Sequence, residues 1–152
     1  MIELNGIAHI QLTVRDVHRS RSFYHKLLHE CFGMTIQYDE PDTFYCIGGR
    51  TGVLIRPSAP EHRDTPFDQW RIGLHHLCFR LRSREDIDAL HVAMKEIGAK
   101  IIRAPEQGPW APGYYSILFE DPDGIRIEAN FVPGRGNLDV IKDRPLTPPD
   151  AA

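Results

Sequence analysis

The segment GIAHIQLTVR at residues 6–15 returns as GLHHLCFRLR at residues 73–82, so the two copies are offset by 67 positions (73 − 6). Each copy has a Gly three residues before a His, and these histidines are His9 and His76. Each His opens a run in which apolar residues alternate with polar or small ones. Alternation with a period of two predicts a half-buried strand. The repeat therefore predicts two related modules, each beginning with a strand that carries a His.

The first module is expected to span residues 1–57 with the element order βαβββ. Its first strand covers 7–14, Asp16 is a plausible N-cap, and the helix runs to about Phe32, where Gly33 ends it. Three short strands should follow near 34–39, 43–48 and 52–57. The helix is expected to bury one apolar stripe, made of Val17, Tyr24, Leu27, Leu28 and Cys31.

A proline-containing connector at 58–72 leads to a second βαβββ module at 73–132. Ser83 resembles the first residue of a capping box, and Gly98 ends the helix that it begins. Strands are expected near 100–103, 114–120 and 125–131, the last two joined by the turn Asp-Pro-Asp-Gly at 121–124. Residues 133–152 carry four prolines and little periodicity, which is typical of an arm or tail.

Composition narrows the classes of function. The chain has 152 residues, a formal net charge of −3, and 41% hydrophobic and 26% charged residues, so nothing favours nucleic acid as a partner. No apolar run approaches the roughly 18 residues that a membrane helix needs, and the N-terminus lacks a secretion signal. Cys31, Cys46 and Cys78 are odd in number and lack CxxC spacing, which favours reduced thiols in the cytoplasm.

The repeated histidines share one face with a carboxylate. In each module the helix must cover the apolar strand face, so the opposite face lines a curved sheet. His9, His76 and, by the same parity, Glu128 fall on that lining. Two imidazoles and one carboxylate leave open coordination positions on a divalent ion. Alone, a strand His is more often structural and a strand Glu solvated. The two histidines occupy equivalent positions in the repeat, and a Glu ends the last strand. Together these features favour a metal site, and no site for an organic cofactor is expected.

These residues carry a family resemblance. His9-Ile10, His76-Leu77-Cys78-Phe79 and the stretch YYSILFEDPDGIRIE at 114–128 resemble the vicinal oxygen chelate superfamily, which includes glyoxalases, bleomycin-resistance proteins and extradiol dioxygenases. The resemblance covers about residues 5–132. It implies an α+β fold, in which two tandem βαβββ modules form a curved, mostly antiparallel mixed sheet around a metal cup. It also implies metal ligands at His9, His76 and Glu128.

One position departs from the pattern of glyoxalase I, where a fourth ligand, a Glu, comes from the last strand of the first module. Internal alignment of the repeat puts Arg56 there. Arginine stays protonated and cannot coordinate a cation, so at most three protein ligands remain. Turned into the cup, Arg56 would hold an anionic substrate beside the metal. Turned outward, it would be merely solvated.

The segment 105–113 is rich in Pro and Gly and is expected to lack regular structure. It could fold over the cup so that Trp110 or Tyr115 shields the metal from water. Trp110 could equally pack in a dimer contact. Parity favours His76 over His75 as the ligand, which leaves His75 a structural role at the entrance to the strand.

The resulting hypothesis is a divalent-metal-dependent enzyme of the glyoxalase/dioxygenase type. It would act on a small oxygen-chelating, possibly anionic substrate as a dioxygenase, lyase, isomerase or transferase. The ion could be Fe, Mn, Ni or Zn. The alternative is a metal-independent protein of the bleomycin-resistance type that sequesters a drug or other ligand. The expected partners are a small-molecule substrate and a second copy in a homodimer, with no nucleic acid and no membrane.

Overall fold

The computed structural model describes residues 2–134, and the chain separates into two compact units. The first unit comprises residues 1–67 together with 122–124, and the second comprises 68–121 together with 125–152. Most of the predicted tail, from residue 135 onward, lies outside the described residues. No helix in the described part of the chain is long and apolar enough to cross a membrane.

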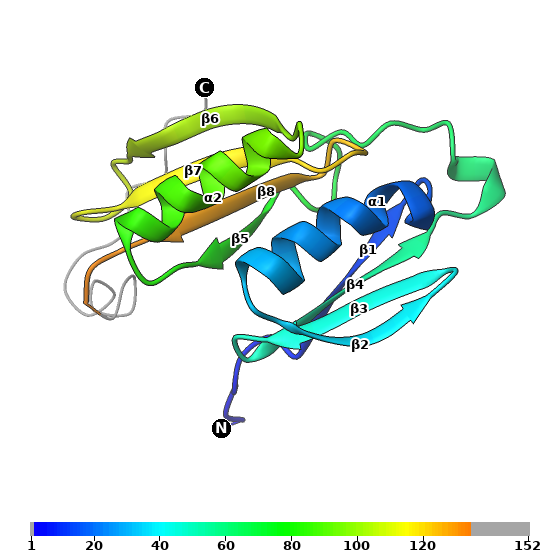
Figure 1. Cartoon of the computed structure of the whole chain (residues 1–152), viewed down its shortest axis with the longest axis horizontal. Helices are drawn as coiled ribbons and strands as arrows, with labels where there is room; N and C mark the ends of the chain where they lie inside the picture. The colour runs from blue at the N-terminus through cyan, green and yellow to red at the C-terminus, as the bar shows by residue number, and fades with distance from the viewer. Residues whose placement is uncertain (1, 135–152) are drawn as a thin grey trace. The chain divides into compact units, whose positions relative to one another are not determined.

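The first unit holds one four-stranded sheet with a helix on one face (Figure 1). The sheet order is β1-β4-β3-β2; β1 runs parallel to β4, and the other neighbours are antiparallel. Its elements are β1 (His9–Val14), α1 (Val17–Tyr24), η1 (His25–Cys31), β2 (Thr35–Glu40), β3 (Thr43–Gly48) and β4 (Thr51–Pro57).

The second unit repeats this topology with the sheet order β5-β8-β7-β6, again with one parallel pair, β5 and β8. Its elements are β5 (Leu77–Arg80), α2 (Arg84–Glu96), β6 (Lys100–Gln107), β7 (Tyr115–Glu120) and β8 (Arg126–Phe131). A short 3₁₀ turn, η2 (Pro60–His62), precedes them. The predicted α+β fold with two tandem βαβββ modules is confirmed.

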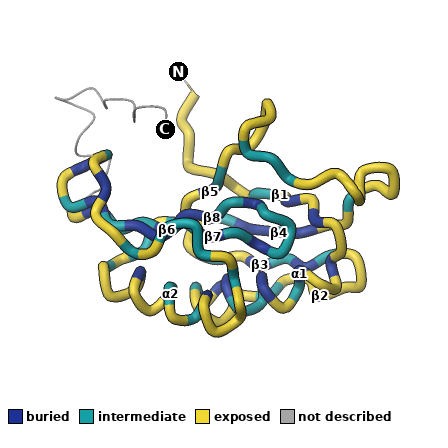
Figure 2. The backbone as a smooth tube through the Cα atoms, turned by 90° about the horizontal axis from the view of Figure 1, so that it is seen from above, coloured by how far each residue is buried: buried dark blue, intermediate teal, exposed yellow. Residues whose placement is uncertain are grey.

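Each helix begins at the residue that the sequence predicts and buries one face of its own sheet. The Asp16 carboxylate accepts from the backbone N–H of His18, and the Ser83 hydroxyl accepts from that of Asp86. In the second unit Ile87 and Met94 of α2 are fully buried, as is Phe119 of β7. Figure 2 shows buried segments, in dark blue, along the strands of the sheets. Because side chains alternate across a strand, the opposite face of each sheet is left as a lining.

Two details of the first helix differ from the prediction. After Tyr24 the chain widens into the π-helix η1, and Cys31 at its end is exposed, although it was expected on the buried stripe. A π-helix bonds residue i to i+5 and turns less per residue than an α-helix. The spacing that would bring Cys31 to the sheet in an α-helix therefore carries it past the buried face.

The predicted irregular segment at 105–113 is also partly wrong, because β6 continues through Pro105 to Gln107. β6 is an edge strand, and its register against β7 shifts between Arg103 and Glu106, around this proline. Proline has no N–H to donate, and it is tolerated in a sheet at such edges and bulges. The irregular loop begins only at Gly108.

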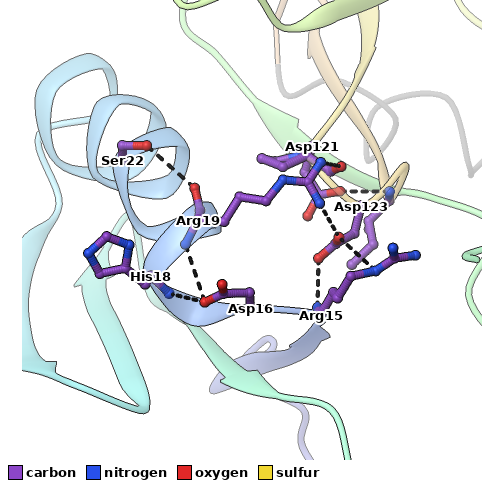
Figure 3. Close-up of polar contacts among 9 residues, drawn as sticks. Arg15, Asp16, His18, Arg19, Ser22, Asp121 and Asp123 are labelled. Carbon is purple, nitrogen blue, oxygen red and sulfur yellow. Dashed lines mark hydrogen bonds and ion pairs between the residues drawn. The ribbon is translucent and has the colours of Figure 1, made fainter. Parts of the chain in front are cut away.

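The predicted turn at 121–124 is held by its two aspartates. Asp121 Oδ1 accepts from the backbone N–H of Ile125 at 2.8 Å, which closes the turn onto β8. Asp123, which groups with the first unit, accepts from the backbone N–H of Arg15 at 2.7 Å and from Arg19 Nη1 at 3.1 Å (Figure 3). The turn is thus fixed by hydrogen bonds as well as by its Pro and Gly.

Candidate metal centre

Strand register puts Glu128 on the lining of the second sheet. Its Cα pairs with Cys78 on one side and Leu118 on the other, while its neighbour Ile127 is fully buried on the α2 side. His76 stands two residues before Cys78 and therefore has the same parity. The sequence prediction that His76 and Glu128 share a face is confirmed by their direct contact.

His76 Nε2 lies 3.2 Å from Glu128 Oε2. The Glu128 side chain is only 9% exposed, whereas the His76 side chain is 35% exposed. A buried carboxylate is tolerated only where hydrogen bonds or opposite charges compensate its lost hydration. The pair therefore consists of a buried carboxylate, which needs compensating partners, and an imidazole that solvent can reach.

The other carboxylate oxygen of Glu128 is fixed by Tyr114, whose hydroxyl donates to Oε1 at 2.7 Å. Asn130 Nδ2 donates to the same hydroxyl at 2.8 Å, and Arg103 Nη2 lies 3.5 Å from Oε1. Burial alone would raise the pKa of Glu128, but the hydrogen bonds from His76 and Tyr114 and the charges of His76 and Arg103 leave this pKa below its ordinary value. Glu128 is therefore ionised at neutral pH, with Oε2 turned to the imidazole.

His76 is held from its other side as well. His75 Nδ1 lies 2.7 Å from His76 Nδ1, and the His75 ring meets the Trp70 ring edge to face at 5.2 Å. Burial, then the charges of His76 and Arg126, lower the pKa of His75. A neutral His75 can accept the Nδ1–H of His76, and this contact orients the His76 ring so that Nε2 faces Glu128 Oε2. Metal-binding histidines commonly use their second nitrogen in this way.

Trp110, which was predicted to shield the metal, contacts Tyr114, and Tyr114 in turn contacts Glu128. Its ring lies 4.9 Å from the Tyr114 ring, and the Arg103 guanidinium lies 5.0 Å from the Trp110 ring centre. Gly108 carries no side chain where Trp110 rests, because a Cβ there would come within 2.1 Å of the ring. The loop is therefore packed against the network around Glu128.

Tyr115, the other predicted shield, lies on the opposite face. Its hydroxyl donates to Asp88 Oδ1 on α2 at 2.8 Å, and the Arg84 guanidinium stands 4.4 Å from its ring centre. Side chains of successive strand residues point to opposite faces, so Tyr115 cannot share the lining with Ser116 and Glu128. Tyr114, just before the strand, takes the place that was predicted for Tyr115.

Sequence reasoning missed Tyr114 and Arg103 as parts of this network. Tyr114 precedes the regular strand, so parity does not assign it a face. Arg103 lies beside a register shift, where alternation also fails. The signal that points to them is indirect: a buried carboxylate needs hydrogen-bond donors, and the neighbouring strands carry few candidates.

In the first unit, His9 opens β1 and pairs with Gly52 of β4, and its side chain is exposed. Arg56 pairs with Thr13, four residues farther along, which corresponds to about 13 Å of strand. Its guanidinium lies 3.3 Å from Asp42 Oδ2, with half of the side chain exposed. Arg56 therefore lies on the His9 face of the sheet, paired with a surface carboxylate far along the strand.

The predicted equivalence between Arg56 and Glu128 is wrong by two residues. Glu128 pairs two residues beyond His76, and the matching place beyond His9 belongs to Leu54, which pairs with Gln11. The cause is the preceding turn. Gly49 and Arg50 make a tight turn with positive φ (57° and 66°) before β4 starts at Thr51, whereas residues 121–125 separate β7 from β8. Aligning Gly52 with Gly124 therefore shifts the strand.

The donor set of the second unit fits a divalent metal ion. Imidazole and carboxylate are ordinary ligands of transition metals, and both groups here have partners that orient them. Among the described residues, no group of three or more His, Cys, Asp and Glu side chains is arranged to hold an ion. His76 and Glu128, which contact each other in the second unit, are therefore candidate ligands, and His9 lies in the first unit.

Comparisons with known proteins agree with this fold. The model of the glyoxalase/bleomycin resistance protein/dioxygenase superfamily matches residues 6–129. The uncharacterised protein YqjT of Bacillus subtilis is 27% identical over 79% of this chain and 94% of its own length. The metallothiol transferase FosB of Shouchella clausii is 27% identical over 84% of this chain and 80% of its own.

Among solved structures, a candidate glyoxalase from Bacillus halodurans superposes with a TM-score of 0.74 at 26% identity. The match covers 84% of this chain and 96% of that protein. The fold of this chain is thus shared with that solved structure. The chain belongs to the glyoxalase/bleomycin resistance protein/dioxygenase superfamily.

Proposed function

We propose that this protein is a divalent-metal-dependent enzyme acting on a small substrate that offers oxygen atoms to the ion. His76 and Glu128 are two ligands in this proposal. His9 is the third, supplied by the first module of the same chain or of a second copy. The superfamily contains many enzymes, and the similarity to a metallothiol transferase is compatible with metal chemistry.

The observation that carries the proposal is the His76–Glu128 contact. One carboxylate oxygen is bound by Tyr114, and the other faces an imidazole nitrogen at 3.2 Å. The network of Tyr114, Asn130 and Arg103 compensates the buried charge and fixes Oε1, which leaves Oε2 directed at His76. Such support is typical of a carboxylate that must keep its charge and direction when a cation arrives.

The ion would act as a Lewis acid that stabilises negative charge on substrate oxygens, or would bind O₂ beside the substrate. The protein's own residues set the conditions for that chemistry. Tyr114 and Arg103 hold Glu128 ionised, and His75 keeps the orientation of His76. Trp110 packs against the ring of Tyr114. With three protein ligands, substrate can occupy the remaining coordination positions.

Metal analysis tests the proposal. Protein purified without chelators should carry one divalent ion per chain, and His76→Ala and Glu128→Gln should lower its affinity more than a hundredfold. His62→Ala, an exposed His on η2, is the matched control and should keep full affinity. Iron would favour O₂ chemistry, nickel or zinc isomerisation, and manganese group transfer. A wild-type protein that takes up no ion, yet binds a ligand, would be a sequestering protein of the bleomycin-resistance type.

The proposal includes a cytoplasmic homodimer, and a mixing experiment tests whether its sites are shared. His9→Ala chains have an intact second module, and His76→Ala chains have an intact first module. If ligands come from two copies, a mixed dimer regains one metal site out of two. If each chain completes its own site, mixing restores none. Elution of the native protein as a monomer in size-exclusion chromatography would contradict the dimer.

A further inference from the structure

The lining of the first sheet carries an aromatic pair whose geometry is unexplained by packing alone. Tyr45 of β3 pairs with Leu54, yet its ring leans along the sheet to Gly52. A Cβ on Gly52 would stand 2.5 Å from the Tyr45 hydroxyl oxygen and 2.7 Å from Cε2 of the ring. The hydroxyl end of Tyr45 therefore rests on the bare backbone of Gly52, and any other residue there would displace it.

Gly52 is the β4 residue beside His9. It pairs with His9 in the parallel ladder, and its N–H donates to the Ala8 carbonyl at 2.9 Å. Neighbouring strands lie about 4.8 Å apart, so the Tyr45 hydroxyl stands one strand spacing from the His9 backbone. The missing side chain at Gly52 thus lets a residue from β3 reach the level of the ligand histidine.

The Tyr45 ring is held in direction while its hydroxyl has no partner. Tyr38 of β2 stacks on it, with ring centres 6.0 Å apart and planes 13° from parallel. Within residues 2–134 no group hydrogen-bonds to the Tyr45 hydroxyl. In contrast, the Tyr114 hydroxyl both donates to Glu128 and accepts from Asn130. A half-buried phenol with a fixed ring and an unused donor is suited to meet a ligand.

We propose that Tyr45 contacts the substrate, that its hydroxyl donates to a substrate oxygen beside His9, and that Gly52 is required to admit it. This inference rests on the proposed function, because it places the substrate at the His9 ligand. It also narrows the substrate class. The stacked pair of Tyr38 and Tyr45 presents a flat aromatic surface, which favours a planar, conjugated oxygen chelator over a saturated one.

The test uses full-length protein, Mn²⁺ and the flat chelator 4-nitrocatechol, whose absorption changes on binding metal. Mn²⁺ affinity is measured first by electron paramagnetic resonance and should be the same in wild type, Tyr45→Phe and Gly52→Ala. Loaded Tyr45→Phe should bind 4-nitrocatechol about five- to tenfold more weakly, as expected for one lost hydrogen bond. Tyr115→Phe, whose hydroxyl faces α2, is the matched control and should bind as wild type does.

A double-mutant cycle separates the contact from general damage. Gly52→Ala should weaken 4-nitrocatechol binding at least as much as Tyr45→Phe does, but should add nothing in a Tyr45→Ala background. Unchanged binding by Tyr45→Phe overturns the inference, as does a Gly52→Ala loss that persists without the ring. If wild type takes no Mn²⁺, the metal proposal fails separately. In that case, calorimetry measures the binding of 4-nitrocatechol to metal-free wild type and to metal-free Tyr45→Phe. Equal affinities of the two proteins, or no binding to either, would again overturn the proposed contact.

Discussion

The two modules share one topology but line their sheets differently. At the level two residues beyond His9 and His76, the first module has Leu54 beside Tyr45, and the second has Glu128 beside Leu118. The first lining is aromatic and exposed, with Tyr38 at 58% and Ile47 at 42% exposure. The second is charged and held by Tyr114.

This difference shows what a buried charge requires. A carboxylate on a sheet lining loses hydration and must be compensated by donors within reach. The second module has Glu128 together with Tyr114 and Arg103, whereas the first has Leu54 at the position that register equates with Glu128. The two modules therefore share the strand alternation that directs side chains to the lining. Among the described residues, only the second module has the buried carboxylate and the residues that compensate its charge.

The largest effect is expected from removing the hydrogen bond that Tyr114 donates to Glu128. Tyr114→Phe should lower metal affinity about tenfold or more and the free energy of unfolding by about 1–3 kcal/mol, because Glu128 Oε1 and Asn130 lose a buried partner. Calorimetric metal titration and urea unfolding measure the two effects. Tyr115→Phe, the neighbouring tyrosine on the other face, should change metal affinity by less than a factor of about two. Equal effects of the two variants would contradict the assignment.

A carboxylate placed in the first module tests which of its residues is structurally equivalent to Glu128. Leu54→Glu presents it at the position that register equates with Glu128, beside the strand of His9, and should tighten metal binding about tenfold. Arg56→Glu, at the position that sequence alignment equates, should leave metal affinity unchanged. Titration with Mn²⁺ or Zn²⁺ distinguishes them. A tighter site in Arg56→Glu would show that alignment, not register, identifies the equivalent position.

The turns before β4 and β8 differ as well, and Asp123 tests the longer one. Asp123→Ala removes two hydrogen-bonded contacts, to the Arg15 backbone and the Arg19 guanidinium, and should destabilise the protein by about 1–2 kcal/mol in urea unfolding. Asp42→Ala removes an exposed pair with Arg56 and should cost less than about 0.5 kcal/mol. A larger loss in Asp42→Ala would be inconsistent with these contacts.

The last prediction concerns the buried face of the first sheet, where Cys46 lies. Burial, with a contribution from Asp39, raises the pKa of Cys46 to about 11. The folded protein keeps this proton where the unfolded thiol, with an ordinary pKa of 9.0, has released it. Stability should therefore fall as pH rises from about 9 to about 11.

Urea unfolding across this range measures the slope. Cys46→Ala should be less stable at every pH because of the lost packing, but should lack the added slope. Cys31→Ala, which removes an exposed thiol, should keep the slope. Parallel pH profiles of wild type and Cys46→Ala would contradict a buried, protonated thiol.

The sequence alone determined the repeat, the two βαβββ modules and the faces of His9, His76 and Glu128. These follow from periodicity and parity, which are properties of neighbouring residues. The starts of both helices also follow from neighbouring residues, since Asp16 and Ser83 each cap the helix that begins directly after them.

Only the tertiary structure decided register and contact. It showed that Leu54 rather than Arg56 corresponds to Glu128, because turn length sets how strands align, and a shift by two leaves parity unchanged. It also replaced Tyr115 by Tyr114 and added Arg103, since residues at strand ends and bulges escape alternation. Which donors reach a buried carboxylate depends on distances between strands, and no local pattern records them.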